Sequence, residues 1–99
     1  MADIDLADLE AFAAVARARS FRGAATARGG SASTLSEAVR RLEARLGVRL
    51  FDRTPQAVRL TEEGRQFHAQ VAPLLAGLED AAADASATAG TVRGRLRVN

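Results

Sequence analysis

The 99-residue sequence contains no cysteine, which excludes disulfide bonds and thiolate metal sites. It also has no uninterrupted apolar run of about 18 residues, the length at which a membrane-spanning helix becomes a candidate. The acidic start, residues 1–5, lacks the basic residues of a secretory signal. We therefore expect a cytoplasmic protein, and the chain length is sufficient for one small domain with a single core.

Lysine is absent as well, and all fourteen basic residues are arginine. The net charge is only +2, but the charges are unevenly distributed along the chain. Residues 11–65 hold eleven arginines against five acidic residues, whereas residues 1–10 hold four acidic residues and no basic one. A basic surplus in the middle of the chain favours a phosphate-binding surface.

Residues for catalysis or metal binding are scarce. His68 is the only histidine, and neither a second histidine nor a cysteine is present to complete a metal site with it. The serine, aspartate and histidine residues show no nucleophile arrangement, and there is no glycine-rich phosphate loop. We therefore predict that the chain is not an enzyme and that it uses no metal and no cofactor.

Apolar periodicity predicts three helices in the first half of the chain. They span residues 6–17, 21–28 and 32–46. Ser20 and Ser31 are suitable N-caps for the second and third helices. Gly29 and Gly30 break the chain between them, because glycine tolerates the backbone angles of a tight turn. Two helices joined by such a turn are typical of a helix-turn-helix.

The next segment has the pattern of a hairpin. Two short, partly alternating runs at residues 48–53 and 58–60 flank a proline-containing turn at residues 54–57. Thr61 then caps a long fourth helix, residues 61–87. The prediction is a mainly α fold: a winged helix-turn-helix of three helices and a two-stranded wing in residues 1–60, followed by a long linker helix.

A heptad-like apolar seam runs along the fourth helix. The seam either packs on the core of its own domain or meets a second subunit. Because it extends further than a domain of this size can cover, we predict a homodimer. The predicted dimerisation residues are Leu6, Phe67, Val71, Leu74, Leu75 and Leu78.

Several motifs of the chain together resemble those of a known family. Residues 31–54, SASTLSEAVRRLEARLGVRLFDRT, resemble the core signature of LysR-type transcriptional regulators, and so do LEAF at residues 9–12 and LTEEG at residues 60–64. The resemblance implies an N-terminal DNA-binding domain whose linker helices pair antiparallel. It also implies that residues 88–99 are a hinge and the start of an effector-binding domain. That domain would bind a small co-inducer, and the full-length protein would form a dimer or tetramer.

The candidate DNA contacts lie on the third helix and in the wing. At 3.6 residues per turn, Ser33, Glu37 and Arg40 fall opposite the apolar stripe of the third helix, where they can reach base edges in a major groove. The resemblance places an arginine in the wing, where it can enter a narrow minor groove. The predicted DNA-binding residues are Ser31, Ala32, Ser33, Thr34, Ser36, Glu37, Arg40, Arg53, Thr54 and Gln56.

Simpler interpretations stay open for each of these features. The polar helix face is also compatible with a solvated surface on which Glu37 pairs with Arg41. Ser31 is also compatible with a role as a helix cap alone. At the level of function, the rivals are a winged domain that binds proteins rather than DNA, and another class of winged regulator, such as a molybdate-responsive or multidrug-resistance-type repressor.

Overall fold

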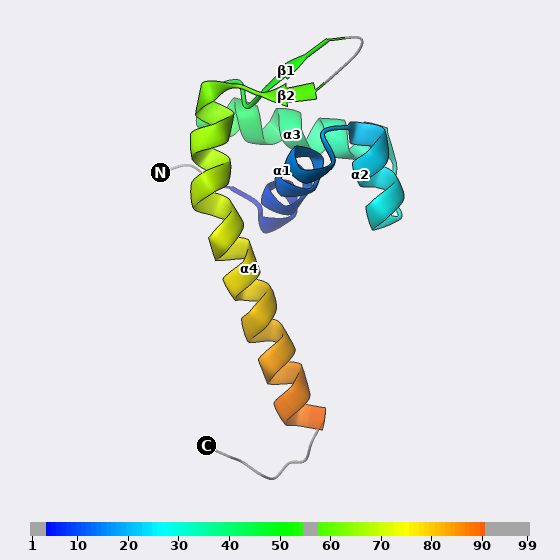
Figure 1. Ribbon diagram of the computed structural model, residues 1–99, viewed down its shortest axis with the longest axis vertical. Coiled ribbons are helices and arrows are strands. Elements are labelled where there is room, and N and C mark those ends of the chain that lie inside the picture. The colour runs from blue at the N-terminus through cyan, green and yellow to red at the C-terminus, as the bar shows by residue number, and fades with distance from the viewer. Residues whose placement is uncertain (1–3, 55–57, 91–99) are drawn as a thin grey trace.

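The computed structural model describes residues 4–54 and 58–90, with side chains up to residue 87. Figure 1 shows the shorter helices and the hairpin gathered at one end of the long helix. The elements are α1 (Leu6–Ala18), α2 (Phe21–Arg28), α3 (Ala32–Leu46), β1 (Phe51–Arg53), β2 (Val58–Leu60) and α4 (Glu62–Gly90). The predicted mainly helical, winged helix-turn-helix architecture is confirmed.

The helix boundaries follow from local capping. The Ser20 hydroxyl accepts a hydrogen bond from the Gly23 amide at 2.9 Å, and the Ser31 hydroxyl accepts one from the Thr34 amide at 3.1 Å. These bonds satisfy amides that have no partner within the first turn of a helix. Gly47 ends α3 with a φ of 76°, a conformation that most other residues adopt only with strain.

Phe12 of α1 lies at the centre of the core and is fully buried. Its ring centroid lies 5.4 Å from that of Phe51 in β1 and 5.5 Å from that of Phe67 in α4. The single histidine, His68, packs edge-on against the same ring at 5.8 Å. One aromatic cluster therefore joins the helical layer, the hairpin and the start of the long helix.

The wing is an antiparallel hairpin in which Phe51 pairs with Leu60 and Arg53 with Val58. Its first strand begins at Phe51, three residues later than the predicted run from residue 48. The reason is a long-range contact, because the amides of Leu50 and Phe51 both donate to the Glu43 carboxylate. These amides are therefore occupied by a side chain of α3 at the point where the strand begins.

The long helix α4 continues through Gly90, so the hinge predicted to begin at residue 88 starts inside the helix. The segment after Pro73 is rich in alanine and contains no second proline, so its composition favours a helix in spite of Gly77. Residues 91–99, the predicted start of a further domain, lie outside the described residues. Within the described ranges, no helix has the length and apolarity needed to cross a membrane.

Candidate nucleic-acid interface

Helices α2 and α3 and the turn between them form the helix-turn-helix. Gly29 adopts a φ of 80°, and the amides of Gly29 and Gly30 both donate to the Ala25 carbonyl, at 2.8 and 3.0 Å. This closes the C-terminal end of α2, and the chain enters α3 after Ser31. The turn thereby sets the orientation of α3 relative to α2.

Helix α3 has one buried and one exposed face. Its buried face consists of Leu35, Ala38, Val39 and Leu42. Most of the predicted base-contacting positions are exposed, namely Ser31, Ser33, Thr34, Glu37 and Arg40. Ser36 is half-buried, and Ala32 is half-buried against the core. The outer face of α3 is therefore a row of small hydroxyls that ends in an acid and an arginine.

Arg41, next to this row, is tied to α1. Its guanidinium donates to both carboxylate oxygens of Asp8, at 3.0 and 3.4 Å, and Asp8 is only 2% exposed. The hydrogen bond with Asp8 and the negative charge of that carboxylate raise the pKa of Arg41 above its ordinary value. Within the described residues, Arg41 forms its ion pair with Asp8 rather than with Glu37, whose charge acts on Arg41 only at longer range.

Arg40 is the exposed cation of this row. In the part of the chain that the structure describes, its guanidinium forms no hydrogen bond or ion pair. A free guanidinium on the outer face of α3 can donate two parallel hydrogen bonds to a guanine edge or to a phosphate.

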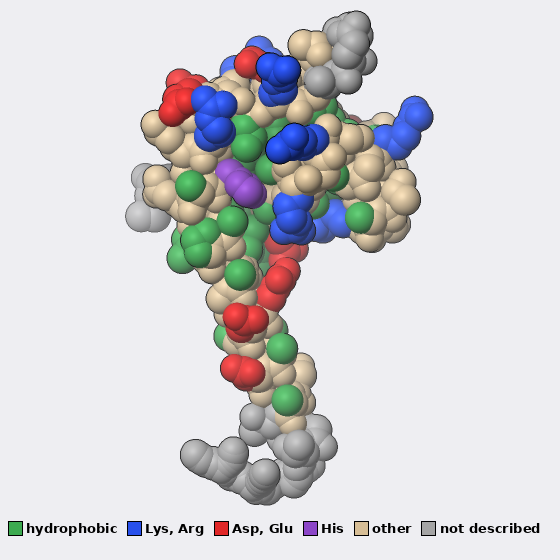
Figure 2. Space-filling view, viewed as in Figure 1, with side chains coloured by type: hydrophobic (Ala, Val, Ile, Leu, Met, Phe, Trp, Pro, Cys, Tyr) green, Lys and Arg blue, Asp and Glu red, His purple; other side chains and the backbone are tan. Residues whose placement is uncertain are grey.

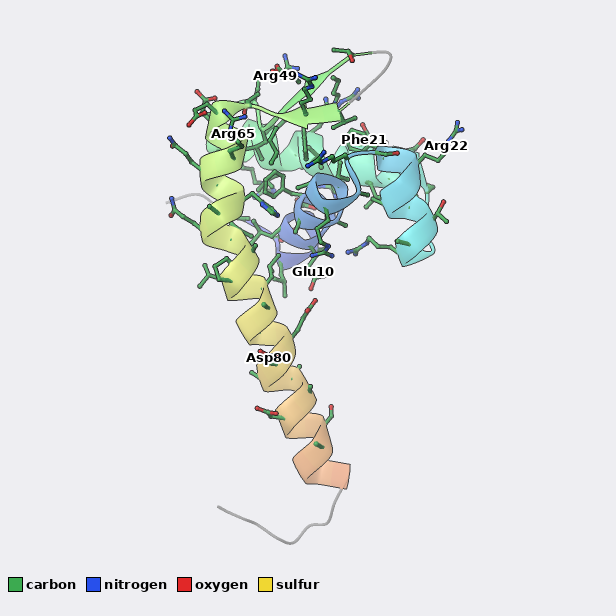
Figure 3. All side chains as sticks on the ribbon, in the orientation of Figure 1. Glu10, Phe21, Arg22, Arg49, Arg65 and Asp80 are labelled. Carbon is green, nitrogen blue, oxygen red and sulfur yellow. The ribbon has the colours of Figure 1, made fainter. Side chains whose placement is uncertain are left out.

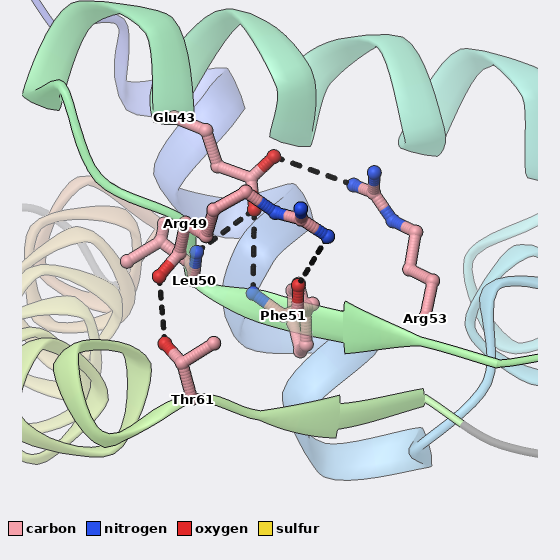
Figure 4. Close-up of polar contacts among 6 residues, drawn as sticks. All are labelled: Glu43, Arg49, Leu50, Phe51, Arg53 and Thr61. Carbon is pink, nitrogen blue, oxygen red and sulfur yellow. Dashed lines mark hydrogen bonds and ion pairs between the residues drawn. The ribbon is translucent and has the colours of Figure 1, made fainter.

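Glu43 joins α3 to the wing, as Figure 4 shows. One oxygen of its carboxylate accepts from the Leu50 amide at 2.8 Å, and the other lies 3.5 Å from the Arg53 guanidinium. On the far side of the hairpin, the Thr61 hydroxyl donates to the Arg49 carbonyl at 2.6 Å. The wing is therefore fixed both to α3 and to the start of α4.

Arg53, predicted at the wing tip, lies at the end of β1 with its side chain turned toward the domain. It is 25% exposed, and its guanidinium carbon lies 5.2 Å from the centre of the Phe21 ring. Two of its nitrogens, Nε and Nη2, are buried without a hydrogen bond. Of the other wing positions, Thr54 is exposed, and Gln56 lies outside the described residues.

The seam of α4 divides into two parts. Val71 is buried and Phe67 packs on the core, so both already serve their own domain. In contrast, Leu74 and Leu78 are 71% and 47% exposed. Of the two remaining predicted dimerisation residues, Leu6 is exposed at 45% and Leu75 is half-buried. Among the described residues, only the exposed members of the seam present an apolar surface that no other part of the structure covers.

Sequence reasoning missed Asp8 and Glu43 as positioning residues. Both lie on helix faces where an acid is ordinarily solvated, and their partners are more than five positions away in the chain. The only local signal is that Asp8 falls one turn before Phe12 and Glu43 one position after Leu42, so each carboxylate lies at the edge of an apolar stripe.

The positive charge of the described surface lies on the globular part alone. Figure 2 shows the arginine side chains there together with some acidic ones, and only acidic charged side chains along the lower part of α4. The acids of that segment are Glu79, Asp80 and Asp84. Within the described ranges, no group of three or more histidine or acidic side chains is suited to hold a metal ion.

Comparison with known proteins gives a consistent result. Residues 6–65 match the family model described as a bacterial regulatory helix-turn-helix protein of the LysR family. A probable hydrogen peroxide-inducible genes activator from Mycobacterium xenopi is 43% identical over 93 residues, and the transcriptional regulator PtxR from Pseudomonas aeruginosa is 42% identical over 95 residues. The alignments cover 94% and 96% of this chain but only 49% and 30% of those relatives.

Solved structures share the fold. The BenM DNA-binding domain in complex with benA site 1 DNA superposes with a TM-score of 0.77 at 28% identity, over 89% of this chain and 99% of that one. A hydrogen peroxide-bound OxyR variant from Corynebacterium glutamicum gives a TM-score of 0.84 at 30% identity, over 93% of this chain and 29% of that one.

Proposed function

The chain belongs to the LysR family of bacterial regulatory helix-turn-helix proteins, and we propose that it binds double-stranded DNA sequence-specifically and thereby regulates transcription. The relatives it matches are transcriptional regulators, and the BenM domain that shares its fold is bound to DNA. The proposal includes a cytoplasmic location at the bacterial nucleoid and the absence of enzymatic activity.

The observation that supports this function best is the exposed polar row of α3 beside the helix-turn-helix turn. A helix fits the major groove, and short hydroxyls such as that of Ser33 allow its backbone to approach the base edges. Ser31 caps α3 and Thr34 lies in its first turn, where the Thr34 amide already donates to the Ser31 hydroxyl. The two hydroxyls lie 2.8 Å apart and can hold a phosphate together with the remaining amides of that turn. Glu37 would then accept from a cytosine amine or repel phosphate in wrong sequences.

The wing contributes in a different way. In the free protein the Arg53 guanidinium lies over the Phe21 ring and pairs with Glu43, so its side chain must break both contacts before it can enter a minor groove. Its Nε and Nη2 are buried there without hydrogen bonds. The free protein therefore already carries an unfavourable desolvation free energy, which offsets part of the free energy needed to break these contacts. Thr54 and Gln56 are the other proposed wing contacts.

A homodimer would present two recognition helices to two half-sites. The exposed leucines Leu74 and Leu78 of α4 support pairing through that helix. The chain spans about half or less of the length of the curated relatives named above. A response to a small co-inducer and a tetramer are proposed only for a longer protein that includes an effector-binding domain, and not for this chain by itself.

Specific DNA binding is tested by fluorescence anisotropy with the duplex upstream of the chain's own gene and a scrambled duplex of equal length. We expect tighter binding to the native duplex and a steep loss of affinity between two salt concentrations, because arginine–phosphate contacts release counterions. Equal affinity for both duplexes, or no binding at low salt, would contradict the proposal and favour a protein-interaction role.

A second prediction concerns Arg40. Replacing it with alanine is expected to weaken binding to the native duplex by about 1–3 kcal/mol if it donates to a guanine, with a much smaller effect on the scrambled duplex. Arg17→Ala, which removes an exposed arginine at the C-terminal end of α1, is the control and should bind both duplexes as the unchanged chain does. An equal loss on both duplexes would assign Arg40 to a phosphate instead.

A further inference from the structure

A cavity of about 410 Å³ opens between the C-terminal end of α1, the wing and the first turns of α4. Its apolar lining consists of Val15, Ala16, Phe51, Val58 and Leu60. The remaining lining residues are Arg19, Arg59 and Arg65, and no acid is among the described residues that line it. Figure 2 shows arginine side chains around apolar ones on the upper part of this face.

Two of the three cations, Arg19 and Arg59, form no hydrogen bond or ion pair through their guanidinium groups within the described ranges, whereas Arg65 is paired with Glu62. The hydrogen bond and the charge of Arg65 lower the pKa of Glu62, which keeps that pair ionised. Arg59 lies opposite Asp52 in the hairpin but forms no ion pair with it. The free positive charge of the cavity therefore lies at Arg19 and Arg59.

The backbone of Arg19 is also unusual. It ends α1 in the left-handed region with a φ of 58°, and it is the only non-glycine residue in the described ranges with a positive φ. This conformation favours glycine, because a side chain there costs stability. The position therefore allows a clean test, since glycine would remove the guanidinium and relieve the strain at once.

We propose that this cavity binds a small organic carboxylate with an apolar body, independently of DNA. Arginine is suited to a carboxylate because its planar fork donates two parallel hydrogen bonds, and the apolar lining accommodates a hydrocarbon chain or ring. The volume lies in the range of small-molecule sites. No residue of α3 lines the cavity, and Figure 1 shows α1 in front of α3, so the recognition helix is separated from the ligand.

Figure 3 labels Arg65 on α4 next to the wing. A carboxylate bound by Arg19 would place its apolar part against Ala16, Val58 and Leu60, the half-buried apolar residues of the lining, since Val15 and Phe51 beneath them are fully buried. An alcohol of the same length would fill the same lining but could not form the charge-assisted bonds. The difference between acid and alcohol therefore isolates the role of the arginine.

The test is a titration of the ¹⁵N-labelled chain with octanoate, followed by amide chemical shifts, with 1-octanol as the neutral control. We expect saturable shifts centred on the lining residues, with 1-octanol at least about tenfold weaker. Arg19→Gly should weaken octanoate binding at least about tenfold while leaving the melting temperature equal or higher. Arg22→Ala, an exposed arginine of α2 outside the cavity, should bind octanoate as the unchanged chain does.

Three outcomes would overturn the proposal. These are the absence of saturable shifts up to the solubility limit, equal binding of octanoate by the Arg19→Gly variant, and displacement of octanoate by a scrambled duplex. The last result would assign these arginines to DNA phosphates. The duplex is added only in a separate competition step. Because the octanoate titration itself contains no DNA, its failure would leave the proposed DNA binding untouched.

Discussion

Replacing Gly64 with alanine is expected to destabilise the domain by about 3 kcal/mol, near the upper end of what overpacking of a tight site costs. A Cβ at this position would lie 2.1 Å from the Leu50 carbonyl oxygen and 3.0 Å from a methyl carbon of Leu60. Since the first of these atoms belongs to the backbone, α4 or the wing must move to relieve the contact.

The movement would also break hydrogen bonds at the same junction. The Leu50 carbonyl accepts from the Thr61 amide at 2.9 Å, and the Thr61 hydroxyl accepts from the Gly64 amide at 2.9 Å. Loss of either bond leaves a partly buried polar group without a partner. For a domain of this size, we expect the melting temperature to fall by at least about 10 °C, measured by circular dichroism at one fixed protein concentration.

Gly77→Ala is the matched control, because it makes the same change in the same helix. A Cβ at Gly77 meets no heavy atom within 4 Å, and alanine favours a helix interior by up to about 1 kcal/mol. This variant should melt at the same or a higher temperature. If Gly64→Ala melted within about 2 °C of the unchanged chain, the tight contact between α4 and the wing would be refuted.

The helices could be predicted closely because their signals are local. Ser20, Ser31 and Gly47 cap or end helices through groups within four residues, and the apolar spacing of α3 identifies its buried face without knowledge of the rest of the fold. The exposed row that carries the proposed function follows directly from that spacing. For this reason the recognition helix and most of its candidate contacts were predictable from the sequence.

The errors arose where distant segments meet. Glu43 binds amides seven and eight positions further along the chain, and this contact delays the start of β1. Arg53 was expected at the wing tip, but the ring of Phe21, from another helix, and the Glu43 carboxylate draw its side chain inward. A heptad pattern likewise cannot distinguish Val71, buried in its own domain, from Leu74, which is exposed.

The second large effect is expected at the exposed part of the α4 seam, Leu74 and Leu78. Leu74→Asp combined with Leu78→Asp is expected to convert the proposed dimer into a monomer, because both side chains are substantially exposed in the isolated chain and neither supports its core. Each leucine buried against a partner contributes about 1.5–3 kcal/mol, and a carboxylate in its place adds a desolvation cost. The mass from sedimentation equilibrium should fall to that of one chain, with the helix content unchanged.

DNA binding should fall with the dimer. Two linked half-site contacts bind about 10²–10⁴ times more tightly than one, so the variant should lose at least about 100-fold in affinity for a duplex with both half-sites. On a duplex with a single half-site it should bind as well as the unchanged chain. Ala83→Asp, an exposed position on the opposite side of α4 from Leu74, is the control and should remain dimeric. A double variant that kept the dimer mass would exclude Leu74 and Leu78 from the interface, and pairing would then have to be sought at Leu6 and the surface of α1.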